Sequence, residues 1–162
     1  MRVLGIDPGL AITGYAVVEE EGSDLQLIAI GVIRTPAKTP SPQRLQSIYQ
    51  GLRQVVDEHR PTSSAVEELF FSRNVRTAMS VGQARGVTLL ALVDARLTIA
   101  EYTPLEVKQA VTGYGNADKR QVQEMVRMLL DLPEVPRPDD AADAAAVAIC
   151  HLHRARMEEL LQ

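Results

Sequence analysis

The chain has 162 residues, of which 46% are hydrophobic and 23% charged, so we expect one globular domain over residues 1–162. No apolar run approaches the roughly 20 residues of a membrane helix, no signal-peptide pattern opens the chain, and cysteine occurs only once, which together favour a cytoplasmic protein without a membrane partner. The net charge of −4 argues against a nucleic-acid partner, yet residues 69–127 carry eight basic and five acidic side chains.

Short apolar runs and turn residues predict three strands in the first part of the chain. The predicted strands are RVLGID (2–7), GYAVVEE (14–20) and LQLIAIGVIRT (25–35). The first ends at Asp7, before a Pro-Gly turn, and EGSD separates the second from the third. Strands so closely spaced indicate an antiparallel meander.

The rest of the chain alternates helices with strands. Predicted helices cover 41–61, 74–96, 104–113, 118–132 and 138–162, and predicted strands cover 63–70 and 97–103. Ser41 is the expected cap of the first helix, and Pro61 is expected to stop it. GYGNADK (113–119) is predicted to be a mobile loop with Tyr114 as its one apolar anchor. This order of elements predicts an α/β fold with a mixed sheet.

Carboxylates stand at the predicted strand ends and at the start of the last helix. Asp7 ends the first strand, at the carboxyl edge where α/β folds bind ligands. Glu67 and Glu68 end the fourth strand, and only one of them can share the face of Asp7, because neighbours in a strand face opposite sides. Asp140 and Asp143 are three residues apart and project from one side of the last helix. The alanines around them would let this helix lie close on the sheet and bring its acids to the strand ends.

Acids brought this close repel one another, and a divalent cation with oxygen ligands removes the conflict. Mg²⁺ suits carboxylates together with a substrate phosphate. The alternative is a set of scattered surface acids, with those of the last helix complementing its dipole. No pattern of cysteine and histidine indicates zinc. His151 and His153 face different ways, although one of them could lie near the acids.

Five ordered segments span nearly the whole chain: GIDPGLAITGYAVV, VEELFFSRN, GQARGV, VKQAVTGYGNADKRQVQEMV and PDDAADAAAVAI. Together they resemble the RuvC family of bacterial Holliday-junction resolvases. The resemblance implies a ribonuclease-H-like α/β fold with a five-stranded mixed sheet flanked by helices. It also implies a homodimer that nicks two strands symmetrically across a four-way DNA junction in recombination and repair, leaving 5′-phosphate and 3′-hydroxyl ends.

The same resemblance implies the residues of the site. The catalytic and metal-binding acids fall on Asp7, Glu67, Asp140 and Asp143. They would hold two Mg²⁺ ions, for which Mn²⁺ can substitute. Asp139 lies outside the family pattern, and a minor role for Glu68 stays open. The expected DNA-binding residues are Phe70 and Arg73, Arg76, Lys108 and Lys119.

Phe70 would stack on an unpaired base near the exchange point, and Lys108 and Lys119 would neutralise charge near the scissile phosphate. Arg73 and Arg76 are lesser candidates for phosphate contacts. The expected partners are four-way junction DNA, a second copy of the chain with the helix from Asn74 in or beside the interface, and the RuvA–RuvB branch-migration complex.

Three other functions share features with this one. Actin-like and sugar-kinase ATPases share an Asp-x-Gly strand end, but they need two such domains, and no second motif of this kind occurs. A non-catalytic junction-binding scaffold would gain nothing from carboxylates that face phosphates. A ribonuclease-H-like RNA processor would prefer RNA or hybrid duplexes to a DNA junction.

Overall fold

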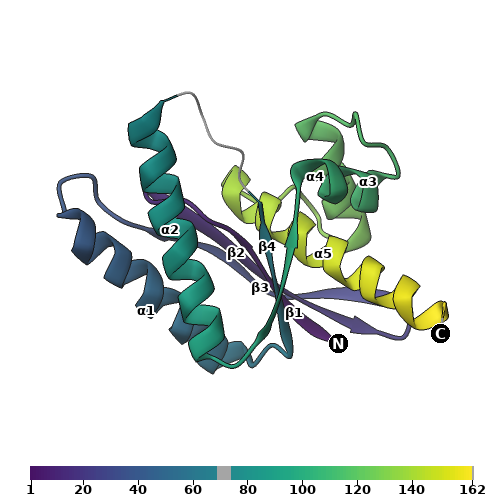
Figure 1. Ribbon diagram of the computed structural model, residues 1–162. Coiled ribbons are helices and arrows are strands. Elements are labelled where there is room, and N and C mark those ends of the chain that lie inside the picture. The colour runs from purple at the N-terminus through teal and green to yellow at the C-terminus, as the bar shows by residue number, and fades with distance from the viewer. Residues whose placement is uncertain (69–73, 162) are drawn as a thin grey trace.

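A five-stranded mixed sheet lies between two layers of helices (Figure 1). The strands are β1 (Arg2–Asp7), β2 (Ile12–Glu21), β3 (Asp24–Arg34), β4 (Ser63–Glu67) and β5 (Thr98–Tyr102). The helices are α1 (Ser41–His59), α2 (Val75–Asp94), α3 (Pro104–Thr112), α4 (Lys119–Leu129) and α5 (Asp139–Leu160). The computed structural model describes residues 1–68 and 74–161.

The sheet order is β3-β2-β1-β4-β5. The three amino-terminal strands are antiparallel, as the predicted meander requires, and β4 and β5 are parallel to β1. The predicted α/β class with a mixed sheet is therefore confirmed. Parallel β1 and β4 end at the same edge of the sheet, which places their final carboxylates side by side.

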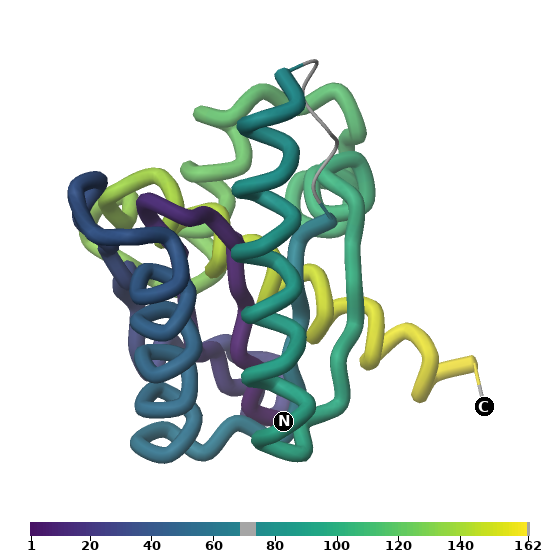
Figure 2. The backbone as a smooth tube through the Cα atoms, turned by 60° about the vertical axis from the view of Figure 1, so that its left-hand side comes forward, coloured from purple at the N-terminus to yellow at the C-terminus, as the bar shows by residue number. Residues whose placement is uncertain are grey.

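Helices α1 and α2 cover one face of the sheet, and α5 covers the other with α3 and α4 packed on it (Figures 1 and 2). The alternation of side chains in β1 separates the two cores: Leu4 and Ile6 are buried beneath α1 and α2, whereas Val3 is buried beneath α5. Asp7 continues the odd positions and faces α5. Among residues 1–68 and 74–161, no helix is both long and apolar enough to cross a membrane.

Helix α5 lies unusually close to β1 and β2, because glycines face it. A Cβ atom at Gly5 would lie 2.2 Å from the carbonyl oxygen of Ala144, and one at Gly14 would lie 1.9 Å from the carbonyl oxygen of Asp140. The alanines of α5 are buried at this contact, as the sequence led us to expect. The strand glycines are the other half of the contact, and sequence reasoning missed them.

The ends of α1 differ from the prediction. Ser41 is not the cap: the N-cap position is Pro40, and Ser41 is the first helical residue. At the other end Arg60 adopts a left-handed conformation with φ of 51°, and its N–H donates to the Val56 carbonyl. Pro61 follows this cap, so the helix does stop where proline requires it.

The segment 113–119 is anchored differently from the prediction. Tyr114 is 57% exposed, whereas Ala117 is 2% exposed and belongs to the core beneath α5. The hydrogen bonds of the segment are local, between Tyr114 and Thr112 and between Ala117 and Tyr114. Asp118 and Gln121 then form a capping box that starts α4.

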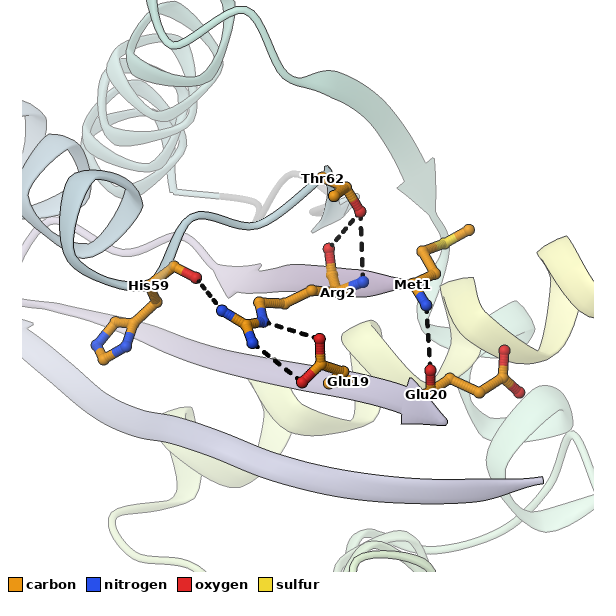
Figure 3. Close-up of polar contacts among 6 residues, drawn as sticks. All are labelled: Met1, Arg2, Glu19, Glu20, His59 and Thr62. Atoms are coloured by element: carbon orange, nitrogen blue, oxygen red, sulfur yellow. Dashed lines mark hydrogen bonds and ion pairs between the residues drawn. The ribbon is translucent and has the colours of Figure 1, made fainter. Parts of the chain in front are cut away.

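The end of β1 opposite Asp7 is held by the side chain of Arg2 (Figure 3). Its guanidinium binds the Glu19 carboxylate of β2 through two hydrogen bonds of 3.2 and 3.0 Å. It also donates a 2.7 Å hydrogen bond to the His59 carbonyl at the end of α1. Thr62, just before β4, exchanges hydrogen bonds with the Arg2 backbone. Arg2 thus joins β1, β2 and α1.

We predict that Gly5→Ala and Gly14→Ala each lower the free energy of unfolding by about 3 kcal/mol or more, because the added methyl group overlaps the backbone of α5. Urea denaturation checks this. Gly51→Ala in α1 is the control: a Cβ built there meets only the flexible side chain of Ile33, so this variant should lose much less stability than Gly5→Ala or Gly14→Ala. Equal stability of Gly14→Ala and the wild type would contradict the close packing of α5.

Candidate active site

The register of the sheet places Asp7 beside Glu67. The parallel ladder between β1 and β4 runs as far as the pair Ile6 and Val66, and Asp7 and Glu67 are the next residue of each strand. Both side chains lie on the face covered by α5, and they share a hydrogen bond. Glu68 follows the last residue of β4, and the alternation of side chains predicts that it faces the opposite side.

Helix α5 adds two further carboxylates at the same place. Gly14 pairs with Asp7 across the β1–β2 ladder, and the Asp140 backbone lies directly against Gly14. Asp143 follows almost one turn later on the same side of α5. The charges of both aspartates act on Asp7. We call Asp7, Glu67, Asp140 and Asp143 the acid cluster.

Burial and mutual repulsion make the cluster reluctant to ionise. Burial, followed by the charges of Glu67 and Asp143, raises the pKa of Asp7 to about 8. Burial and the charge of Asp143 raise the pKa of Glu67 to about 7. Burial also raises the pKa of Asp143, although Lys119 opposes the shift. Near neutral pH the hydrogen-bonded pair of Asp7 and Glu67 therefore favours holding one shared proton.

Lysine side chains line the open side of the cluster. The Lys119 Nζ atom lies 3.3 Å from Asp139 Oδ2 and 3.4 Å from Asp143 Oδ2. Partial burial lowers the pKa of Lys119, but the two aspartates outweigh that effect and the net shift is upward. A pocket of about 210 Å³ adjoins the pair and is lined by Glu67, Asp143, Lys119 and Lys108, among others.

The chemistry of the cluster fits a hard divalent cation. All four groups offer oxygen atoms, and a bound cation would relieve the repulsion and desolvation that now keep Asp7 protonated. As the side chains stand in the described part of the chain, no three potential ligands are arranged to hold an ion. The Asp143 carboxylate points to Lys119 instead. Binding an ion would require Asp143 to exchange that ion pair for the metal.

Known proteins share both the sequence and the architecture of this chain. The family model for the crossover junction endodeoxyribonuclease RuvC matches residues 3–151. The RuvC of Chloroflexus aggregans is 59% identical over 155 residues, which are 96% of this chain and 94% of that protein. The RuvC of Pelotomaculum thermopropionicum is 54% identical over 162 residues, covering 100% and 99% of the two chains. This chain belongs to the RuvC family.

A solved RuvC structure agrees with the whole fold. Thermus thermophilus RuvC in complex with a Holliday junction substrate superposes with a TM-score of 0.93 at 40% identity, covering 98% of this chain and 96% of that one. The yeast mitochondrial Holliday junction resolvase Ydc2 has a TM-score of 0.71 at 15% identity, which shows a common fold alone. The resemblance first recognised from the sequence motifs is therefore confirmed.

Of the five DNA-binding residues predicted from the RuvC motifs, the structure describes three. Phe70 and Arg73 lie outside the described residues. Arg76 is exposed in the first turn of α2, where its backbone N–H donates to the N-cap Asn74. Lys108 and Lys119 both line the pocket beside the cluster. Their roles in binding DNA stay predictions.

The two candidate histidines are engaged away from the acids. His151 contacts the Tyr102 hydroxyl at 2.8 Å and the Ser63 hydroxyl at 3.1 Å. Burial lowers the pKa of His151, so its ring is neutral at pH 7. His153 lies 3.0 Å from the carbonyl oxygen of Ala110. Glu68 has its backbone N–H bonded to the carbonyl oxygen of Tyr102.

Sequence reasoning did not single out Arg85, which contacts the backbone of Glu67. Its motif, GQARGV, contributes to the family resemblance, and the small residues around the arginine indicate close packing. The available signal was the single arginine among those small residues, since a charge within a packing motif usually has a partner. The identity of that partner could not be read from the sequence.

The raised pKa values predict that the metal-free protein loses stability as pH rises from about 4 to about 8. In this range the folded acids keep protons that the unfolded chain has already released, so deprotonation favours unfolding. Asp7→Asn removes the most strongly shifted group and should stabilise the protein at pH 8.5 but not at pH 4. Urea denaturation in EDTA at the two pH values checks this. A wild-type protein that is more stable at pH 8.5 than at pH 5 would contradict it.

Proposed function

We propose that this protein resolves four-way DNA junctions by metal-dependent nicking of two strands, placed symmetrically across the junction. The observation that carries the proposal is the convergence of four carboxylates at one sheet edge in a chain of the RuvC family. A related protein, T. thermophilus RuvC, has been solved with a Holliday junction substrate. The products would carry 5′-phosphate and 3′-hydroxyl ends.

The acid cluster would hold two Mg²⁺ ions, with Mn²⁺ able to substitute. When bound, such ions supply an activated water molecule and neutralise charge on the phosphate and the leaving oxygen. Asp7 and Glu67 come from rigid neighbouring strands, whereas Asp140 and Asp143 come from a helix packed on those strands. This support would keep the carboxylates in place while the substrate binds and leaves.

Lys119 would change partners during the reaction. It now forms ion pairs with Asp139 and Asp143, and a cation bound by Asp143 would replace it there. Once displaced, the ammonium group stands beside Lys108 at the pocket and can bind a phosphate of the DNA. Both lysines would then contribute salt-dependent affinity, and Arg76 would add a contact from the start of α2.

A second copy of the chain would complete the nuclease, because nicking two strands requires two sites. Helix α2 offers a surface for this contact. Its exposed apolar side chains are Val75, Met79, Leu90 and Val93, which are 77%, 63%, 54% and 60% exposed. Nothing lies within 4 Å of a Cβ built at Gly82 or Gly86, so a partner backbone can approach there. A two-fold dimer through α2 would match the symmetry of a junction.

The proposed location of the enzyme is the cytoplasm, where it would act on branched DNA. Its proposed partner is the RuvA–RuvB branch-migration complex. Membership of the RuvC family supports both proposals. The single cysteine, Cys150, is free and buried, which suits a reducing compartment.

The variants Asp140→Asn and Asp139→Asn compare a proposed catalytic acid with the acid next to it in the sequence. Asp140→Asn should reduce magnesium-dependent nicking of a synthetic four-way junction by orders of magnitude, while junction affinity holds or rises because a negative charge facing phosphate is lost. Asp139→Asn should keep most of the nicking activity. Asp139 does not act as a helix cap, since the N-cap is Pro138, and its carboxylate contacts Lys119 and Gln123.

Gel-shift binding in EDTA and nicking assays in Mg²⁺ measure both properties for the two variants. An inactive Asp139→Asn beside a fully active Asp140→Asn would mean that the assignment of acids on α5 is wrong.

Phe70→Ala should keep metal binding and lose substrate positioning, as a residue that stacks on bases requires.

Sedimentation should find a dimer at micromolar concentration without DNA. Met79→Arg places a charge in the proposed α2 interface and should shift the protein to the monomer, with loss of paired nicking. Met128→Arg on α4 is the matched control, because Met128 is 59% exposed and lies outside the proposed interface. A wild-type monomer, or the same dimer in both variants, would contradict an interface through α2.

A further inference from the structure

Arg85 of α2 contacts β4, which ends at the acid cluster, and its parallel neighbour β5. Its Nη1 atom donates a 3.0 Å hydrogen bond to the backbone carbonyl oxygen of Glu67. Its Nη2 atom forms an ion pair with the Glu101 carboxylate of β5. The side chain is 21% exposed, so it lies largely between α2 and the sheet. The planar guanidinium suits this double contact, since its donors lie in a fixed fork.

The peptide group that follows Glu67 is held at both ends. Its carbonyl oxygen accepts the hydrogen bond from Arg85, and its N–H, which belongs to Glu68, donates to the Tyr102 carbonyl oxygen at 2.7 Å. The β1–β4 ladder ends one residue earlier, at Ile6 and Val66. Arg85 thus supplies a donor where the pairing of β4 with β1 has stopped.

We propose that Arg85 is a positioning residue that sets the orientation of the Glu67 carboxylate for metal binding, by fixing the peptide group after it. The inference rests on the proposed metal-dependent function of the acid cluster. Without this anchor the backbone at the end of β4 could shift at Glu67, which would carry the Glu67 side chain with it and move its carboxylate relative to Asp7. Because metal ligands must be held within fractions of an ångström, such a change weakens the site without unfolding the strand.

The contacts of Arg85 distinguish this role from phosphate binding. Two of its guanidinium nitrogens are already engaged, one by Glu67 and one by Glu101. A neighbouring carboxylate also reduces the attraction of the group for phosphate. Arg85 further links the acid cluster to α2, so movement of α2 would be felt at Glu67.

Arg2, at the start of β1, provides a matched control. Arg2 also joins a carboxylate, that of Glu19, to a backbone carbonyl, that of His59 (Figure 3). Its contacts lie at the start of β1, whereas the acid cluster lies at the end of that strand. Arg2→Gln therefore removes similar interactions without touching the support of Glu67.

The experiment compares Arg85→Gln, Arg85→Lys and Arg2→Gln with the wild type. Three quantities are measured for each protein. They are manganese binding to the DNA-free protein by calorimetry, the Mg²⁺ dependence of nicking on a synthetic junction, and junction affinity in EDTA. Arg85→Gln should weaken Mn²⁺ binding and raise the Mg²⁺ concentration for half-maximal nicking by about tenfold or more, with junction affinity nearly unchanged. Arg85→Lys keeps one donor and the charge and should recover part of the loss. Arg2→Gln should lower the melting temperature and leave metal binding unchanged.

Unchanged metal binding in Arg85→Gln would overturn the proposal, as would equal losses in Arg85→Gln and Arg2→Gln, which would indicate a merely structural role. A fall in junction affinity alone would identify Arg85 as a phosphate contact. A wild type that neither binds Mn²⁺ nor requires a metal would contradict the proposed function itself. In that case amide exchange decides: faster exchange at Glu68 in Arg85→Gln but not in Arg2→Gln supports the positioning role, and equal exchange rates contradict it.

Discussion

The contact between α5 and Gly14 is the constraint on which the acid cluster depends. The Asp140 carbonyl lies where any residue other than glycine at position 14 would place its Cβ atom. Gly14 in turn pairs with Asp7 across the β1–β2 ladder. A helix held one side chain further from the sheet would carry Asp140 and Asp143 away from the strand carboxylates. Gly5 repeats the contact further along α5, and the buried alanines of the helix complete it.

This close packing has an electrostatic cost, and the chemistry of the site follows from it. Four carboxylates are brought together where water is partly excluded, so Asp7 retains a proton near neutral pH. In the metal-free protein the shared proton and the ammonium group of Lys119 reduce the repulsion. Cations would replace both, which makes the same charges that destabilise the empty site the source of its affinity for metal. In the metal-free state, the carboxylates that would bind the metal are therefore partly neutralised.

Much of the fold and of the cluster could be predicted because it depends on local patterns. The period of apolar residues predicts the strands and helices, and the alternation of side chains restricts the face of Asp7 to one of Glu67 and Glu68. The family motif then selects Glu67. The spacing of Asp140 and Asp143 placed both on one side of a helix. The family motifs then supplied the activity, which periodicity alone does not specify.

What the sequence did not reveal depends on contacts between distant segments. Gly14 has a meaning only once α5 lies over it, and Arg85 only once α2 lies beside β4. Lys119 was expected to face phosphate, but in the free protein it faces Asp143, a choice that depends on the state of the site. Ser41 follows Pro40, which already occupies the cap position, so the helix starts one residue before the pattern suggested.

The most direct test of this account is to locate Mn²⁺ in crystals of the wild-type protein by anomalous diffraction. The account predicts ions bound by oxygen atoms of Asp7, Glu67, Asp140 and Asp143, with the Lys119 ammonium group moved away from Asp143. Ions bound elsewhere on the protein, or a cluster that stays free of metal with the Lys119 ion pairs intact at saturating Mn²⁺, would contradict it.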